Sequence, residues 1–395
     1  DHIAGSGVRK DVTSLTASEI ENLRHALQSV MDDDGPNGFQ AIAAYHGSPP
    51  MCHMPDGRDV ACCTHGMASF PHWHRLFVKQ MEDALAAHGA HIGIPYWDWT
   101  SAFSHLPALV TDHEHNPFHH GHIAHRNVDT SRSPRDMLFN DPEHGSESFF
   151  YRQVLLALEQ TDFCQFEVQF EITHNAIHSW TGGHTPYGMS SLEYTAYDPL
   201  FYLHHSNTDR IWAIWQALQK YRGFQYNAAH CDIQVLKQPL KPFSESRNPN
   251  PVTRANSRAV DSFDYERLNY QYDTLTFHGH SISELDAMLQ ERKKEERTFA
   301  AFLLHGFGAS ADVSFDVCTP DGHCAFAGTF AVLGGELEMP WSFERLFRYD
   351  ITKVLKQMNL HYDSEFHFEL KIVGTDGTEL PSDRIKSPTI EHHGG

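Results

Sequence analysis

The stretch Phe166-Glu-Val-Gln-Phe-Glu-Ile-Thr-His-Asn-Ala-Ile-His-Ser-Trp180 predicts a helix that carries two histidines on one face. His174 and His178 are four residues apart, which places their Cβ atoms about 5–6 Å from each other. Two imidazoles at this distance can bind one metal ion, or they can simply lie on a polar helix face. Phe170 and Ile177 at neighbouring positions indicate a partly buried face. Because buried imidazoles without partners are costly, the stretch favours part of a metal site.

A third ligand can come from the stretch 199–222, which predicts a long helix and contains the pair His204-His205. Adjacent residues lie about 100° apart around a helix, so only one of these two imidazoles can point at the same ion. The spacing alone leaves both residues as candidates.

The N-terminal part offers a second set of imidazoles, before and within a helix expected at about 69–88. The candidates are His46, His65, His72 and His74. Two separate sets of three imidazoles, without a carboxylate or a thiolate among them, suit copper or zinc better than magnesium or calcium. The sequence therefore predicts two sets of histidines that suit copper or zinc.

The sequence pattern divides the chain in two. Up to residue 288 it is mostly helical, with further helices expected after the capping-box motif Thr16-Ala-Ser-Glu19 and at 146–160. After residue 298 it alternates apolar and polar residues, most clearly in Phe366-His-Phe-Glu-Leu-Lys-Ile372. Further strands are expected at 313–317 and 329–333. We therefore expect a mainly α domain over 1–288, a charged linker over 289–297 and an antiparallel β domain over 298–395.

Composition excludes several classes of partner. The 395 residues include 30 Lys and Arg against 51 Asp and Glu, a net charge of −21, which argues against nucleic acid and anionic membranes. No apolar run approaches the roughly 18 residues that a membrane helix needs. The chain begins at Asp1 rather than Met and shows no signal sequence, so we expect either that processing removed a signal sequence or that the chain is a piece of a longer one. Its seven cysteines suit a large secreted protein with a few disulfides and one cysteine left over.

Four motifs together resemble the binuclear type 3 copper family, which contains tyrosinases, catechol oxidases and molluscan hemocyanins. They are Phe70-Pro-His-Trp-His-Arg75, Pro95-Tyr-Trp-Asp-Trp99, His174-x3-His178 and Asp198-Pro-Leu-Phe-Tyr-Leu-His-His205. The resemblance implies two copper ions in a helical bundle. It implies copper A ligands at His46, His65 and His74, and copper B ligands at His174, His178 and His205. It also implies that Phe201 packs on a copper A imidazole.

Within this family, the chain most resembles a functional unit of the molluscan hemocyanins. The resemblance lies in its length, in Val8-Arg-Lys-Asp-Val-Thr-Ser-Leu-Thr16 and in Phe330-Ala-Val-Leu-Gly-Gly-Glu-Leu-Glu-Met-Pro-Trp341. It implies an oxygen carrier rather than an enzyme, which binds dioxygen reversibly between the coppers as a bridging peroxide. It further implies one unit of a multi-unit chain, assembled with other subunits into a large homo-oligomer and secreted into the hemolymph.

The resemblance also implies how access to the copper pair is controlled. A leucine of the β-sandwich domain, here Leu333, would cover the entrance, and Trp73 would help to line an apolar pocket. Leu333 can instead be an ordinary core residue. The alternative function is a phenol oxidase that oxidises o-diphenols at the same copper pair, and the two functions differ in how far a phenol can enter.

The cysteines fit the same resemblance. It implies the disulfides Cys52–Cys62, Cys164–Cys231 and Cys318–Cys324, and a thioether between Cys63 and His65 that would fix the imidazole ring. Residues i and i+2 of an extended segment point the same way, so Cys63 can reach His65. The sequence does not exclude an exchange of Cys62 and Cys63 in these roles.

Overall fold

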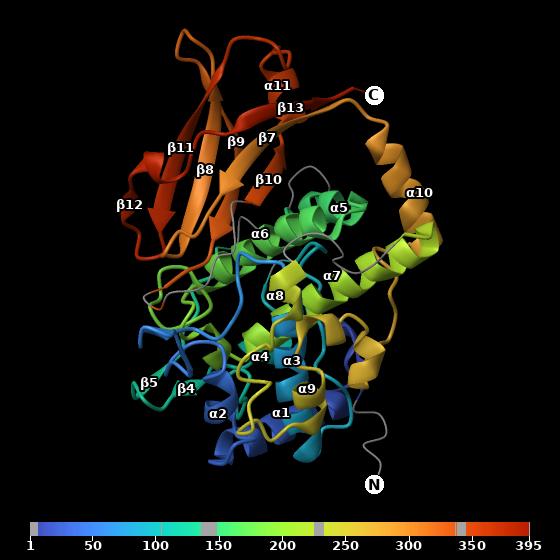
Figure 1. Ribbon diagram of the computed structural model, residues 1–395, viewed down its shortest axis with the longest axis vertical. Coiled ribbons are helices and arrows are strands. Elements are labelled where there is room, and N and C mark those ends of the chain that lie inside the picture. The colour runs from blue at the N-terminus through green and yellow to red at the C-terminus, as the bar shows by residue number, and fades with distance from the viewer. Residues whose placement is uncertain are drawn as a thin grey trace.

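The structure is a computed structural model, and it describes residues 7–103, 105–135, 148–224, 233–335, 337 and 345–394. Its helices gather at one end of the molecule and its long strands at the other (Figure 1). The helices of the first part are α1 Ala17–Asp32, α2 Phe39–Ala43, α3 Phe70–Ala87, α4 Ala108–Thr111, α5 Tyr151–Glu159, α6 Phe163–Gly182, α7 Leu200–Arg222, α8 Ile233–Lys237, α9 Pro251–Ala255 and α10 Ile282–Lys293. Short strands pair within this part: β1 Val8–Arg9 with β6 Gln271–Tyr272, β2 Cys52–His53 with β3 Asp59–Val60, and β4 His122–Ile123 with β5 Val128–Asp129.

The first helix begins as its sequence motif predicts. The Thr16 side chain accepts a hydrogen bond from the backbone N–H of Glu19, and the Glu19 carboxylate accepts one from the backbone N–H of Thr16. This capping box satisfies two amide groups that the first turn leaves without helical partners. Leu23, Leu27 and Val30 then bury one face of α1.

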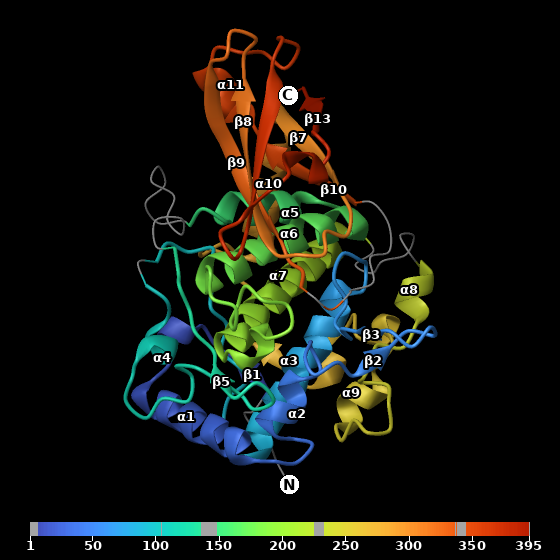
Figure 2. The ribbon, with the colours of Figure 1, turned by 90° about the vertical axis from the view of Figure 1, so that its left-hand side faces the viewer.

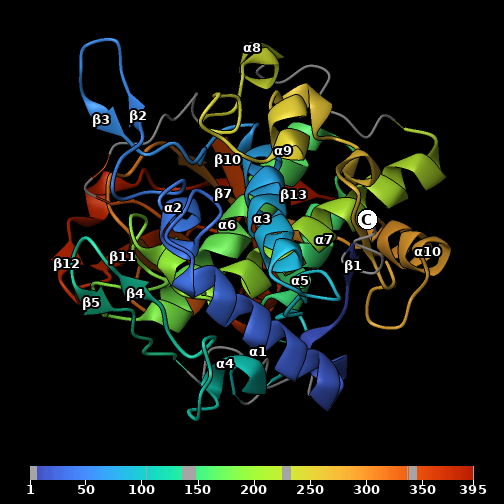
Figure 3. The same cartoon turned by 90° about the horizontal axis from the view of Figure 1, so that it is seen from below.

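Three long helices form the centre of the helical part, and the prediction of each is confirmed within a few residues. Figure 3 shows α3 in the middle, with α1, α2 and α7 around it. Helix α6 begins three residues earlier than expected, because the Asp162 carboxylate caps the N–H groups of Cys164 and Gln165. Every residue from 166 to 182 of α6 is buried. Such a helix shows little amphipathic pattern, so its true start was hard to see in the sequence.

The second part is an antiparallel β-sandwich, as expected. Its elements are β7 Arg297–Leu304, β8 Ala311–Cys318, β9 Cys324–Val332, β10 Arg345–Asp350, α11 Thr352–Gln357, β11 His367–Gly374, β12 Glu379–Leu380 and β13 Thr389–His393. The strand order is β10-β7-β13 in one sheet and β12-β11-β8-β9 in the other. Aromatic rings fill the space between the sheets, with Phe302 of β7 lying 5.0 Å from Phe315 of β8 and 4.9 Å from Phe330 of β9 between ring centroids.

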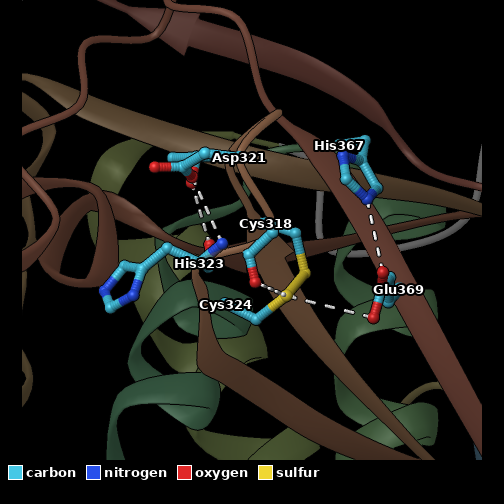
Figure 4. The surroundings of a disulfide bond; sticks show 8 residues. Cys318, Asp321, His323, Cys324, His367 and Glu369 are labelled. Atoms are coloured by element: carbon cyan, nitrogen blue, oxygen red, sulfur yellow. Dashed lines mark hydrogen bonds and ion pairs between the residues drawn. A yellow bond between two sulfur atoms is a disulfide. The ribbon is translucent and has the colours of Figure 1, made fainter.

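A disulfide joins the ends of two neighbouring strands of the larger sheet. Cys318 of β8 and Cys324 of β9 are directly opposite each other and are bonded. His367 of β11 is opposite Cys318, and the Glu369 carboxylate of the same strand lies 4.0 Å from the Cys324 sulfur (Figure 4). The predicted pairing of these two cysteines is confirmed.

Helix α6 joins the two parts: it lies with α5 directly beneath the sandwich, and α7 and α3 lie below it (Figure 2). Its residues Val168 and Ile172 belong to the apolar core of the sandwich. Further along, the Asn175 amide donates to the carbonyl of Ala331 at 3.3 Å, and the Ser179 hydroxyl donates to the Asp312 carboxylate at 2.6 Å. The helix that carries two of the candidate metal ligands is therefore fixed directly to the β domain.

Two details differ from the expected boundaries. Helix α10 continues to Lys293, inside the segment 289–297 expected as a linker, and β7 begins at Arg297. Strand β9 ends at Val332, so Leu333 directly follows the strand in which it was expected. No helix in the described ranges is both long and apolar enough to span a membrane.

Candidate metal centre

Helices α6 and α7 bring three histidines together in a buried cluster that we call group B: His174, His178 and His205. The Nε2 atom of His178 lies 2.9 Å from that of His174 and 3.3 Å from that of His205. All three side chains are buried. The spacing of four residues on α6 brings the first two imidazoles together edge to face, with an interplanar angle of 82°, and α7 supplies the third.

A second cluster, group A, contains His46, His65 and His74. His46 follows α2, His65 lies in the loop before α3, and His74 lies in the first turns of α3. The Nε2 atoms of His74 and His46 are 3.4 Å apart, and the His65 ring centroid lies 4.8 Å from that of His74. These three imidazoles, which the resemblance implied as copper A ligands, also meet in the structure.

The two groups face each other. The rings of His74 and His205 stack with centroids 4.7 Å apart and an interplanar angle of 15°. The ring centroids of His65 in group A and His174 in group B are 6.3 Å apart. Six imidazoles from five segments of the chain therefore share one site with two halves.

Backbone carbonyls fix the tautomer of most of these imidazoles. The Nδ1 atoms of His46, His74, His174 and His178 lie within hydrogen-bond distance of the carbonyl oxygens of Leu192, Phe70, Glu171 and Met189, at 3.1, 2.8, 2.9 and 3.0 Å. A carbonyl only accepts, so in each neutral ring Nδ1 carries the proton and Nε2 presents its lone pair.

The lone pairs test whether a metal fits. Two Nε2 lone pairs that face each other at 2.9–3.4 Å, with no proton between them, repel unless a cation lies among them. Neutral imidazoles held through Nδ1 by a second group are the usual arrangement of metal-binding histidines. Among the described residues, the histidine groupings contain no carboxylate. The donor set therefore fits copper or zinc.

Burial keeps these imidazoles neutral. Desolvation lowers the pKa of His46 to about 3, and it lowers the pKa of His174 to about 3 as well. The same cause lowers the pKa of His65, His74, His178 and His205 well below the usual 6.5. At neutral pH all six rings are therefore free of the proton that would compete with a metal.

This burial predicts that the copper-free protein loses stability as the pH falls. In the unfolded chain each imidazole takes up a proton near pH 6.5, whereas in the folded chain it stays neutral to much lower pH. Stability is then fully present above about pH 6.5 and is lost below it, by up to about 1.4 kcal/mol per pH unit for each such histidine. Urea unfolding of chelator-treated protein should show a lower midpoint at about pH 5.5 than at about pH 7.5.

The copper-loaded protein is the control for this titration. A bound metal holds the imidazoles deprotonated in the folded state, and its binding energy stabilises that state. The loaded protein should therefore stay more stable than the stripped protein at each pH. A midpoint of the stripped protein that is the same at both pH values, or higher in acid, would contradict the burial of neutral imidazoles.

The structure separates His72 from the site but leaves His204 beside it. His72 packs against Trp212 and Phe263, with ring centroids 4.8 and 4.7 Å away. His204 is grouped with the three histidines of group B, and its ring lies parallel to that of His174 at 5.1 Å. Geometry thus removes His72 as a ligand candidate, while the preference for His205 rests on its Nε2 contact with His178.

Aromatic side chains surround both groups. Phe201 stacks on His205 at 4.3 Å and meets His46 edge-on at 5.1 Å, so it contacts the implied copper A imidazole and a group B imidazole as well. Trp73 lies 4.9 Å from His74 and 5.7 Å from His46. Phe70 lies between the groups, 4.6 Å from His74 and 4.7 Å from His174. Apolar aromatic side chains therefore contact imidazoles of both groups.

Two of the three cysteines near group A form the disulfide that the resemblance implied, and the third does not. Cys52 and Cys62 form a disulfide, and Cys63 is free and buried. The Cys63 sulfur and nitrogen atoms of His65 and His46 all lie within 4.8 Å of one another. Cys164 is in a disulfide, and its expected partner Cys231 lies outside the described residues. The structure therefore places Cys63, rather than Cys62, within reach of His65.

Leu333, the residue expected to cover the site, leaves the sandwich and enters the helical part. It is buried and belongs to the apolar cluster that contains Phe70, Phe201 and Cys63, whereas its neighbour Val332 belongs to the core of the sandwich. The role of Leu333 as a cover stays a prediction.

Sequence reasoning missed the segment 189–195, whose carbonyl oxygens hold His46 and His178. Main-chain acceptors leave no signature in a sequence, because every residue carries one.

Comparisons with known proteins agree across the whole chain. Residues 36–218 match the family model of the common central domain of tyrosinase, and residues 292–394 match that of the haemocyanin beta-sandwich. Hemocyanin 1 of Megathura crenulata is 69% identical over 393 residues, which are 100% of this chain and 12% of that protein. Unit G of the beta-C chain of Helix pomatia hemocyanin is 66% identical over 98% of this chain and 96% of that unit. A solved functional unit of octopus hemocyanin is 57% identical and superposes with a TM-score of 0.95, over 98% of this chain and 100% of that unit.

Proposed function

This chain belongs to the molluscan hemocyanins, a branch of the type 3 copper proteins, and on that premise we propose that it binds dioxygen reversibly at a pair of copper ions. The observation that supports the proposal most is the meeting of groups A and B, with two sets of three neutral imidazoles around one apolar space. His46, His65 and His74 would hold one copper, and His174, His178 and His205 the other.

The copper pair, when bound, supplies the two electrons that dioxygen accepts on binding and returns on release. The chain's own residues do the rest. Carbonyls at Nδ1 keep the imidazoles oriented, so little rearrangement is needed when the metal binds. Phe70 and Phe201 exclude water from the space between the groups. These aromatic rings have no acidic proton to give to the bound gas, which favours its release unchanged.

Oxygen uptake by the isolated unit tests this proposal. The copper-loaded protein should take up one dioxygen for each pair of coppers and release it under vacuum over repeated cycles. Uptake that is not released, or that consumes oxygen continuously, would refute a carrier function.

The alternative is a phenol oxidase that uses the same metal pair. The match of residues 36–218 to the tyrosinase central domain supports it, since the site itself resembles that of an oxidase. The burial of Leu333 in the helical part supports the carrier instead, because a phenol ring needs a wider entrance than dioxygen. We therefore propose that any o-diphenol oxidation is latent until the entrance opens.

The chain is proposed to act as one unit of a longer protein. It spans 12% of the length of the Megathura protein, and it spans 32% of an octopus chain described as units Ode to Odg. We propose that several such units in series form a subunit, that subunits assemble into a large homo-oligomer, and that the protein is secreted into the hemolymph. The disulfides Cys52–Cys62 and Cys318–Cys324 support an extracellular location.

We also propose that Cys63 and His65 become joined by a thioether. The Cys63 S–H bond and one C–H bond of the His65 ring break, one carbon–sulfur bond forms, and two electrons and two protons pass to dioxygen, which would bind at the copper pair and be the oxidant. The peptide that contains both residues should therefore weigh two hydrogens less than its sequence predicts. The Cys63 sulfur should also resist alkylation after denaturation and reduction. Mass spectrometry of native protein and of a Cys63→Ser variant tests this, and a native peptide of full mass that is alkylated at Cys63 would exclude the bond.

A further inference from the structure

The segment between α6 and α7 touches both metal-ligand groups with its backbone. The Nδ1 atom of His178 donates to the carbonyl of Met189 at 3.0 Å, and the Nδ1 atom of His46 donates to the carbonyl of Leu192 at 3.1 Å. The next carbonyl, that of Glu193, accepts from the backbone N–H of Ser48 at 3.1 Å. This short segment is therefore fixed against both halves of the site.

The Glu193 side chain binds a different partner, the segment of the β domain that follows β9. Its Oε1 atom accepts a hydrogen bond from the backbone N–H of Leu337 at 2.8 Å. Gly335 lies directly against the carboxylate, since a Cβ atom at this position would overlap both carboxylate oxygens. Ser191 donates to Oε2 at 3.3 Å. Glu193 as a whole is 8% exposed, so little water competes for these contacts.

We call the contacts of Glu193 with Leu337 and Gly335 the clasp. The segment that the clasp holds is the one that carries Leu333. On its other side, the Ser310 hydroxyl donates to the carbonyl of Gly334 at 2.8 Å and accepts from the N–H of Gly334 at 2.9 Å. Leu333 and Leu337 both pack on the apolar cluster of the helical part. Ser310 therefore bonds the segment to the β domain, and Glu193 bonds it to the helical part that contains groups A and B.

We propose that Glu193 is a positioning residue that determines which molecules reach the metal pair, because it holds the Leu333 segment closed over the helical part. A hydrogen bond from an amide to a buried carboxylate is stronger than one between neutral groups, and it acts here on the segment itself. Other polar contacts between the two parts, such as those of Ser179 and Arg135 with Asp312, do not involve Leu333, Gly334, Gly335 or Leu337. The inference rests on the proposed copper site and concerns only access to it.

The test compares o-diphenol oxidation by three variants, expressed per pair of bound coppers. Glu193→Ala removes the clasp and should raise kcat/KM for catechol by at least about tenfold, with a larger gain for a bulky tert-butylcatechol. Glu193→Gln keeps an acceptor oxygen of the same shape and should stay within about twofold of the parent protein. Asp312→Ala breaks the contacts of Asp312 with Ser179 and Arg135, which join the same two parts without touching the Leu333 segment, and it should also stay within about twofold.

The outcomes separate this inference from the proposed function. A parent protein without two coppers, or without reversible oxygen uptake, would refute the copper site. A parent protein that carries oxygen while Glu193→Ala leaves diphenol turnover unchanged would refute the clasp alone, and so would an equal gain in Asp312→Ala. If Glu193→Ala fails to fold, Gly335→Ala is the second variant. Its new Cβ atom would overlap the Glu193 carboxylate and displace it from the segment, so catechol turnover should also rise.

Discussion

The His178→Ala variant is expected to lose dioxygen binding completely and to retain one copper in place of two. His178 lies at the centre of group B, with its Nε2 atom 2.9 Å from that of His174 and 3.3 Å from that of His205. Its removal leaves two imidazoles, which hold copper weakly, and a dioxygen molecule then meets a single metal that cannot supply two electrons. Copper analysis and oxygen uptake of the purified variant measure both losses.

The matched control is His72→Ala, which removes another fully buried imidazole from the same helical part. His72 packs against Trp212 and Phe263, so this variant should keep both coppers and reversible oxygen uptake, although a cavity lowers its stability by a few kcal/mol. Two coppers and full oxygenation in His178→Ala would contradict the assignment of group B. The loss of copper in His72→Ala but not in His178→Ala would mean that His72, and not His178, is the ligand.

The Leu333→Ala variant is expected to convert the carrier into an effective o-diphenol oxidase without a change in copper content. Leu333 is buried where the β domain enters the helical cluster that contains Phe70 and Phe201. Truncation opens a passage that dioxygen did not need but a phenol ring does. The change should also cost about 2–4 kcal/mol of stability, because it leaves a cavity. Catechol turnover per copper pair, measured beside urea unfolding, tests both expectations.

Val332→Ala is the control for Leu333→Ala. Val332 is equally buried and lies next in the chain, but its side chain belongs to the sandwich core. This variant should lose stability without a gain in turnover. Equal turnover gains in both variants would mean that general loosening exposes the copper pair, and an unchanged Leu333→Ala would mean that another residue guards it.

The sequence predicts the elements that carry strong periodicity. Phe366–Ile372 alternates over seven residues, and the structure has β11 there at His367–Gly374. The four-residue spacing of His174 and His178 predicts that their imidazoles share one helix face, and they do, with ring centroids 4.7 Å apart. Both signals are local, because a strand or a helix face is determined within a few residues.

The features that depend on distant parts of the chain were not predictable in this way. The choice between His204 and His205 cannot be read from α7, which is buried on every side over most of its length and thus presents both rings to the interior. The acceptors for Nδ1 of His46 and His178 are main-chain carbonyls. The contact of Glu193 with Leu337 joins residues 144 positions apart, and no sequence pattern near either residue predicts it.

An anomalous difference map at the copper absorption edge, from crystals of the copper-loaded protein, tests the central claim most directly. The account predicts two peaks, one about 2 Å from the Nε2 atoms of His46, His65 and His74, and the other about 2 Å from those of His174, His178 and His205. A single peak, or a second peak bound by His204 in place of His205, would contradict it.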